Sequence, residues 1–92
     1  MKRKTPSHIA SKKGYIEVVK YLIEQCHANI EARDNNGWTP LHNASYHGQI
    51  ETAKYLIEQC HADAKAKDNY GRTPLHIASE NRTREYLLSL VH

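Results

Sequence analysis

Histidine and cysteine are the residues of this 92-residue chain that could do chemistry. His8, His42 and His76 each stand two residues after a proline that follows a threonine. Because histidine titrates near neutral pH and ligates metals, these three are candidates for catalysis or metal binding. The pairs Cys26-His27 and Cys60-His61 add two sulfurs and two imidazoles, which are donors of the kind found in tetrahedral zinc sites.

The spacing of the Cys-His pairs argues against a shared metal. Both pairs belong to a block, Lys20–Ala28, that recurs unchanged at Lys54–Ala62. Equivalent residues of stacked helices lie roughly 8–10 Å apart, whereas a disulfide needs Cα atoms within about 7 Å and zinc needs donors at about 2.0–2.3 Å. We therefore expect two reduced, half-buried thiols at helix ends, each beside an exposed histidine. Zinc binding through these pairs ranks below protein binding and below a structural role, and above enzymatic activity.

A repeat of 34 residues organises the rest of the chain. Thr5-Pro6 recurs as Thr39-Pro40 and Thr73-Pro74, and the alignment needs no gap, so Leu22, Leu56 and Leu90 are expected to be equivalent. Threonine suits the N-cap of a helix and proline its first position, which predicts a short helix from Pro40 that stops at Gly48.

A second helix and a turn complete each unit. Apolar residues at Ile50, Ala53, Leu56 and Ile57 predict a helix with one buried face. The strings Asp34-Asn-Asn-Gly37 and Asp68-Asn-Tyr-Gly71 predict turns before the next Thr-Pro. No unit can bury its apolar face alone, so the units must stack.

The segments Thr39–Ala44 and Thr73–Ala78 resemble the ankyrin-repeat signature Thr-Pro-Leu-His-x-Ala. This resemblance implies an all-α fold: an ankyrin-repeat solenoid of about three stacked helix-turn-helix units linked by β-turn fingers. The chain is expected to form a single domain, 1–92, with units at about 5–34, 35–68 and 69–92. The resemblance also implies that His8, His42 and His76 are structural, bonding the threonine and neighbouring backbone.

The chain departs from the ankyrin pattern at several positions. A Cys-His pair replaces one glycine, which should slightly extend the end of the second helix or the loop after it. Ser7 stands where the other units have Leu41 and Leu75, and the gapless alignment puts Arg82 and Arg84 in place of Gly48 and Ile50, so polar caps are expected at both ends of the stack. Asn43 is expected to be partly exposed or hydrogen-bonded, with a role in partner binding as the alternative.

Composition and the missing motifs narrow the function. The net charge of +3 is too small to indicate nucleic acid. The run Lys2, Arg3 and Lys4 is expected to be solvated, with a nuclear address or a phosphate contact as the alternative. The sequence shows no secretory signal and no membrane span, so we expect an intracellular protein, cytoplasmic or nuclear, that does not bind membranes. It lacks phosphate-binding loops, zinc-protease motifs and nucleophile elbows, and the carboxylates Glu17, Glu24, Glu51 and Glu58 are expected on a solvated face. We expect no enzymatic activity and no cofactor.

Binding to another protein is the function the repeat predicts. Solenoids bind through a concave face built from equivalent positions of successive units. Trp38, Tyr46 and Tyr70 are large rings at positions that the fold does not require, whereas Tyr21 and Tyr55 are expected to pack on the convex side. The predicted protein-binding residues are the variable ones of the turn tips and first helices: Lys12, Lys13, Arg33, Asn35, Asn36, Trp38, Tyr46, His47, Lys67, Asn69, Tyr70, Arg72, Glu80 and Asn81.

The expected partner is a protein or peptide of acidic or polar character, and the chain is expected to be a monomer or to self-associate weakly end to end. The alternative is a structural spacer, or a fragment or designed piece of a longer ankyrin array, with no partner of its own.

Overall fold

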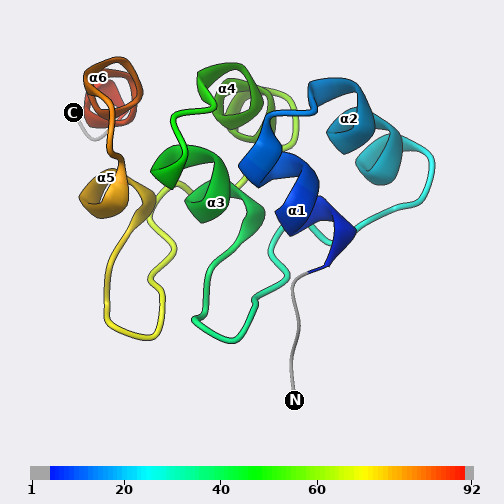
Figure 1. Cartoon of the computed structure of the whole chain (residues 1–92), viewed down its shortest axis with the longest axis horizontal. Helices are drawn as coiled ribbons and strands as arrows, with labels where there is room; N and C mark the ends of the chain where they lie inside the picture. Colours follow the sequence, from blue (N-terminus) through cyan, green and yellow to red (C-terminus); the bar gives the residue numbers. More distant parts are fainter. Residues whose placement is uncertain (1–4, 91–92) are drawn as a thin grey trace.

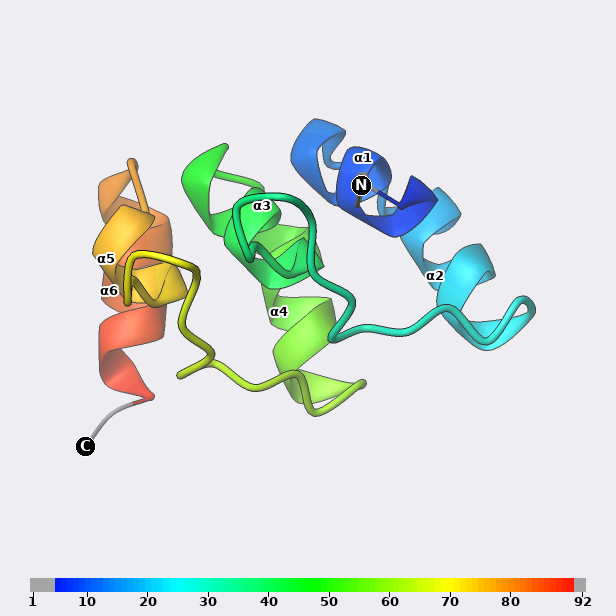
Figure 2. The same ribbon diagram turned by 90° about the horizontal axis from the view of Figure 1, so that it is seen from below.

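The computed structural model describes residues 5–90 as two rows of helices (Figure 1). The inner row contains α1 (Pro6–Lys13), α3 (Pro40–Tyr46) and α5 (Pro74–Ile77), and the outer row contains α2 (Ile16–Glu24), α4 (Ile50–Glu58) and α6 (Asn81–Ser89). Extended loops lead from each outer helix to the next inner helix and project as fingers (Figures 1 and 2). The predicted all-α solenoid of three units is confirmed. None of the helices within residues 5–90 is long and apolar enough to cross a membrane.

Each inner helix begins with the same capping arrangement. In α3 the hydroxyl of Thr39 accepts a hydrogen bond from the His42 amide at 3.3 Å, and the Thr39 amide donates to His42 Nδ1 at 3.1 Å. Thr5 with His8 and Thr73 with His76 repeat this pattern. Because proline occupies the first helical position, its missing N–H leaves no bond unmade. The three histidines are therefore structural, as predicted.

The outer helices α2 and α4 end in an extended turn. His27 and His61 adopt the left-handed conformation, with φ of 57° and 59°. The Ala28 amide then donates to the Leu22 carbonyl, six residues back. At the end of α1, where Gly14 is the left-handed residue, the closing bond from Tyr15 reaches only five residues back, to Ala10. The Cys-His pair thus adds one residue to the turn, as predicted.

The core lies between the two rows and between successive units. Val19, Leu56 and Ala53 of the outer helices are fully buried against Leu41 and Ala44 of α3. The buried histidines link the units, because His8 Nε2 lies 2.6 Å from the Trp38 carbonyl and His42 Nε2 lies 2.9 Å from the Arg72 carbonyl. Each carbonyl belongs to the finger that leads into the next inner helix.

The third unit is three residues shorter than the alignment predicted. Tyr55 Oη donates to a Glu24 carboxylate oxygen across 31 residues, and Tyr86 Oη makes the same bond with Glu58 across only 28. Tyr86 is therefore the counterpart of Tyr55, and the outer helix of the third unit aligns at an offset of 31. The gapless period, with Leu90 equivalent to Leu56, is wrong: Leu56 is fully buried, whereas Leu90 is 38% exposed.

The shortening removes the last turn of the third inner helix. Helix α5 is a single turn, and Ala78 leaves it with φ −60° and ψ 125°. The guanidinium of Arg84 donates to the Ala78 carbonyl at 3.1 Å. At the corrected offset Arg84 replaces Ala53, not Ile50, and Arg82 has no glycine counterpart. The polar cap predicted at this end is present, with Arg84 in the place of a buried core residue.

Candidate protein-binding surface

Two buried aspartates shape the fingers. Asp34 Oδ1 accepts hydrogen bonds from the amides of Asn36 and Trp38 at 2.9 and 3.0 Å. Asp68 Oδ1 accepts from the amides of Tyr70 and Arg72 at 2.8 and 2.9 Å. These bonds fold the backbone around each carboxylate and turn the intervening side chains outward, which places Asn35, Asn36, Asn69 and Tyr70 at exposed finger tips.

The carboxylate of Asp68 also joins the two fingers. Its Oδ2 accepts from the indole Nε1 of Trp38 and from Nε of Arg72, both at 2.9 Å. Burial of this carboxyl opposes ionisation, but the hydrogen bonds from Arg72, Tyr70 and Trp38 outweigh that effect and lower its pKa to about 2. Asp68 is therefore a charged anchor beneath the surface.

Further hydrogen bonds lock one finger to the next. The Asn69 amide and side chain donate to the carbonyls of Asn36 and Asn35 at 3.0 and 2.9 Å. Arg33 donates to the Gly37 carbonyl at 3.0 Å and to the Lys67 carbonyl. Arg33 and Asn69 were predicted as partner-binding residues, and both also hold the stack together.

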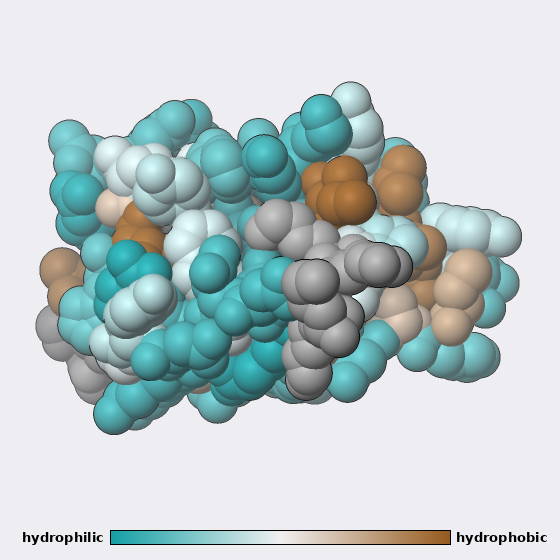
Figure 3. All heavy atoms as spheres, turned by 60° about the horizontal axis from the view of Figure 1, so that its bottom comes forward, coloured by the Kyte–Doolittle hydropathy of each residue, from teal (hydrophilic) through white to brown (hydrophobic). Residues whose placement is uncertain are grey.

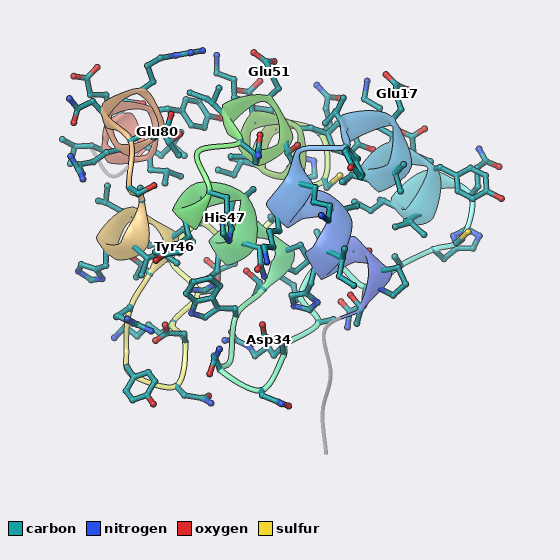
Figure 4. All side chains as sticks on the ribbon, in the orientation of Figure 1. Glu17, Asp34, Tyr46, His47, Glu51 and Glu80 are labelled. Atoms are coloured by element: carbon teal, nitrogen blue, oxygen red, sulfur yellow. The ribbon has the colours of Figure 1, made fainter. Side chains whose placement is uncertain are left out.

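Trp38 is the centre of an aromatic cluster on α3. Its ring lies 5.3 Å from the Tyr46 ring and 6.1 Å from the His42 ring, and Tyr46 meets His47 edge-on at 5.0 Å. Trp38 is half-buried and bonds Asp68, so the expectation that the fold does not require it is wrong. Tyr46, by contrast, is 47% exposed, and Figure 4 shows it with His47 at the end of α3.

We call the exposed residues at the carboxy-terminal ends of α1 and α3 and in the finger segments 33–38 and 67–72 the inner surface. Tyr70, at the tip of the second finger, is 75% exposed, and the Arg72 guanidinium lies 5.1 Å from its ring centre. The exposed cations of this surface are Lys12, Lys13, Arg33, Lys67 and Arg72. Within these segments the carboxylates are those of Asp34 and Asp68, and both are buried, whereas Asp63, earlier in the second finger, is exposed. The inner surface is therefore aromatic and basic.

Two predicted residues lie elsewhere. Glu80 and Asn81 were aligned with Tyr46 and His47, but the three-residue shortening removes those positions from the third unit. Glu80 is instead the N-cap of α6 and Asn81 its first residue. The Glu80 carboxylate lies so close to Gly48 that a Cβ there would meet its Cδ at 2.5 Å, and Figure 4 shows Glu80 beside the outer row.

Asn43 has a local role within α3. Asn43 is 1% exposed, and its Nδ2 donates to the Thr39 carbonyl at 3.3 Å. It is hydrogen-bonded, as the first interpretation held, and the alternative of a partner contact is wrong because the side chain does not reach the surface.

The thiols are unpaired and differ in exposure. Cys60 is partly buried and burial raises its pKa, whereas Cys26 is exposed, against the prediction of two half-buried thiols. Within residues 5–90 no three His, Cys, Asp or Glu side chains converge so that they could hold a metal ion.

Sequence comparison missed a set of contacts between the outer helices. The half-buried Tyr55 donates a hydrogen bond to Glu24, and Lys20 Nζ lies 5.5 Å from its ring centre. Tyr86 makes the same two contacts with Glu58 and Lys54. Glu24 and Glu58 are exposed, as predicted, but each also accepts a bond from a tyrosine. The repeated Lys-Tyr-x-x-Glu string was the available signal.

Comparison with known families agrees with this architecture. A family model described as ankyrin repeats, in three copies, matches residues 7–92. A search of curated proteins found no match. With the family model covering nearly the whole chain, with a Thr-Pro-capped inner helix and an outer helix in each unit, and with fingers between successive units, this chain belongs to the ankyrin-repeat family.

Proposed function

We propose that this chain binds an acidic or polar segment of a partner protein across its inner surface. Ankyrin repeats are generally protein-interaction modules. The observation that carries the finer proposal is the pairing of exposed Tyr46 with half-buried Trp38, whose rings lie 5.3 Å apart. Tryptophan, tyrosine and arginine are the residue types that dominate binding energy at interfaces.

The aromatic cluster is already ordered before any partner arrives. Trp38 is fixed by its hydrogen bond to Asp68, and Tyr46 packs against Trp38 and His47. Binding to such rings loses little side-chain entropy, which favours affinity. The same surface carries the exposed cations Lys12, Lys13 and Arg72, and the carboxylates within its segments, Asp34 and Asp68, are buried, so an acidic segment fits this surface best.

The buried histidines of the inner helices use their ring nitrogens for contacts within the protein, which supports a binding function over a catalytic one. In His8 and His42 the Nδ1 atom accepts a backbone N–H, so Nε2 carries the proton that it shares with a carbonyl of the next finger. Both ring nitrogens are occupied within the protein. Neither ring is placed to transfer a proton to a bound molecule.

A peptide-display experiment tests the proposal. Peptides selected from a random displayed library against the 92-residue chain are expected to be enriched in Asp and Glu. Their affinity should fall at least roughly tenfold in the double variant Tyr46→Ala with Tyr70→Ala, because it removes two exposed anchors. Tyr15→Ala is the matched control, since Tyr15 is 55% exposed and lies at the start of α2.

Three outcomes would contradict the proposal. If the double variant keeps full affinity while the control also does, the aromatic residues are not the anchors. If the selected peptides carry no excess of acidic residues, or if Lys12→Glu with Lys13→Glu leaves their association rate unchanged, the basic residues do not choose the partner.

A further inference from the structure

The first repeat exposes a face that the other two repeats bury. Ile9 and Ile77 hold the same position of the inner helix, yet Ile9 is 46% exposed and Ile77 only 9%. Val18 is 46% exposed, whereas its counterparts Thr52 and Thr83 are 1% and 0% exposed. The difference arises because the second and third repeats each have a repeat stacked on this side.

This amino-terminal face is more apolar than the interface inside the stack. Ile9 replaces buried Asn43, and Val18 replaces buried Thr52. The predicted polar cap at this end is therefore wrong, although Ser7 itself is buried. Figure 3 shows hydrophobic atoms gathered over the first repeat, at the right of the view.

A hollow of about 300 Å³ lies on the same face. Its walls include Pro6, Leu22, Ala28 and Ala32. The counterparts of these residues in the second repeat, Pro40, Leu56, Ala62 and Ala66, are all buried. The hollow therefore corresponds to the space that a preceding repeat fills at each interface within the stack.

Tyr21 indicates the chemistry that this face can recognise. Tyr55 and Tyr86 each donate to a glutamate of the preceding outer helix at 2.7 Å, beneath a lysine 5.5 Å away. Tyr21 stands at the same position of α2 and is 60% exposed. Its hydroxyl meets no such carboxylate from residues 5–90.

From these contacts we propose that the amino-terminal face of the first repeat is an interaction surface for another ankyrin repeat. The partner repeat presents an uncapped carboxy-terminal face, with glutamate and lysine on its outer helix at the positions of Glu24 and Lys20. Its glutamate accepts the hydrogen bond of Tyr21, and its apolar residues cover Ile9 and Val18. This surface is separate from the inner surface, so the two proposals fail or hold independently.

A second copy of this chain does not offer the required face. At the offset of the third repeat, Glu85 replaces Lys54 and Ser89 replaces Glu58. Arg84 also replaces the core residue Ala53 at that end. A second copy stacked end to end would therefore bring neither the glutamate nor the lysine to Tyr21.

The test places a repeat of the right type on this face. Residues 39–72 are duplicated directly ahead of Thr5, so that Arg72 precedes Thr5 as it precedes Thr73. We expect one cooperative unfolding transition with a midpoint at higher urea concentration than that of the parent chain. Tyr21→Phe should lower the midpoint of the extended chain and leave the parent unchanged, while Tyr70→Phe should change neither.

The opposing results are equally specific. Two separate transitions, or a midpoint no higher than that of the parent, would show that the added repeat does not dock. An equal effect of Tyr21→Phe in both chains would remove the tyrosine from the interface. Dimerisation of the parent in sedimentation, abolished by Ile9→Glu, would make a second copy the occupant and overturn the proposal.

Discussion

The indole Nε1 of Trp38 donates to Asp68 Oδ2 at 2.9 Å, so the largest side chain of the first finger is fastened to the buried carboxylate of the second. This bond connects stability with binding, because Trp38 also supports the exposed ring of Tyr46. The surface proposed to bind a partner is thus built on the contacts that hold two repeats together.

Replacing Trp38 by phenylalanine should separate these two roles. The variant keeps an aromatic ring but removes the N–H, so the free energy of unfolding should fall by about 1.5–3 kcal/mol, the range for hydrogen bonds to charged groups. Urea unfolding followed by circular dichroism measures the change. Tyr70→Phe, at an exposed finger tip, is the control: its free energy of unfolding should lie within about 0.5 kcal/mol of that of the parent. Equal stability of Trp38→Phe and the parent would show that the bond contributes nothing.

Asp68 gives the fold a specific acid sensitivity. Its pKa is about 2 in the folded chain and about 3.9 in an unfolded one, so its contribution to stability is complete above about pH 4 and is lost as the pH falls towards 2. Asp68→Asn should weaken the loss of stability in this window, as measured by urea unfolding at a series of pH values. An unchanged acid profile in Asp68→Asn would assign the sensitivity to other carboxylates.

Most of the fold could be predicted from the sequence because its determinants are local and repeated. Thr39, Pro40 and Gly48 mark the ends of a helix by backbone chemistry alone, and identical blocks must take the same place in each unit. The third unit escaped prediction because its Thr-Pro start keeps the 34-residue spacing while the helix behind it is three residues shorter. The string Thr83-x-x-Tyr86-Leu, matching Thr52-x-x-Tyr55-Leu, carries the correct offset.

The binding surface was less predictable than the fold. Exposure of Tyr70 follows from its place in a turn, but the partnership of Trp38 with Asp68 joins residues 30 positions apart in different repeats. Residue type cannot show that a tryptophan in a finger, predicted to contact a partner, also forms a hydrogen bond within the fold. The exposure of Ile9 could have been predicted from the repeat alignment. Its counterparts Asn43 and Ile77 are each covered by the repeat before their own, whereas Ile9 belongs to the first repeat of the stack.

His42 should make the chain less stable below neutral pH. Burial lowers its pKa in the folded state, so the unfolded chain binds a proton first and stability falls as the pH drops below about 6.5. Protonation also removes Nδ1 as the acceptor for the Thr39 amide. His42→Ala should cost more than His76→Ala by about 1–3 kcal/mol, because His76 is exposed and has no finger carbonyl beyond it within residues 5–90. If His42→Ala and His76→Ala lower the free energy of unfolding equally, as measured with urea, the hydrogen bond of His42 to the next finger does not stabilise the fold.

Gly37 and Gly71 allow the packing of the fingers to be measured. Both have positive φ, 79° and 77°, so alanine strains either position by about 1–2 kcal/mol. A Cβ at Gly37 would also lie 2.7 Å from the Asn69 backbone nitrogen, whereas at Gly71 it would meet nothing within 4 Å. Gly37→Ala should therefore destabilise the chain clearly more than Gly71→Ala. If Gly37→Ala and Gly71→Ala lower the thermal unfolding midpoint equally, the packing of the first finger against the second does not contribute to stability.

The left-handed histidines at the ends of α2 and α4 leave room for stabilisation. His27 and His61 have φ of 57° and 59°, a conformation that costs a residue with a Cβ about 1–2 kcal/mol and glycine almost nothing. Both side chains are exposed, so His27→Gly and His61→Gly should each raise the free energy of unfolding by up to about 1 kcal/mol. Gln25→Gly is the control, since Gln25 has right-handed angles and glycine there should lower stability. A loss of stability in both histidine variants would mean that the imidazoles make contacts worth more than the backbone strain they carry.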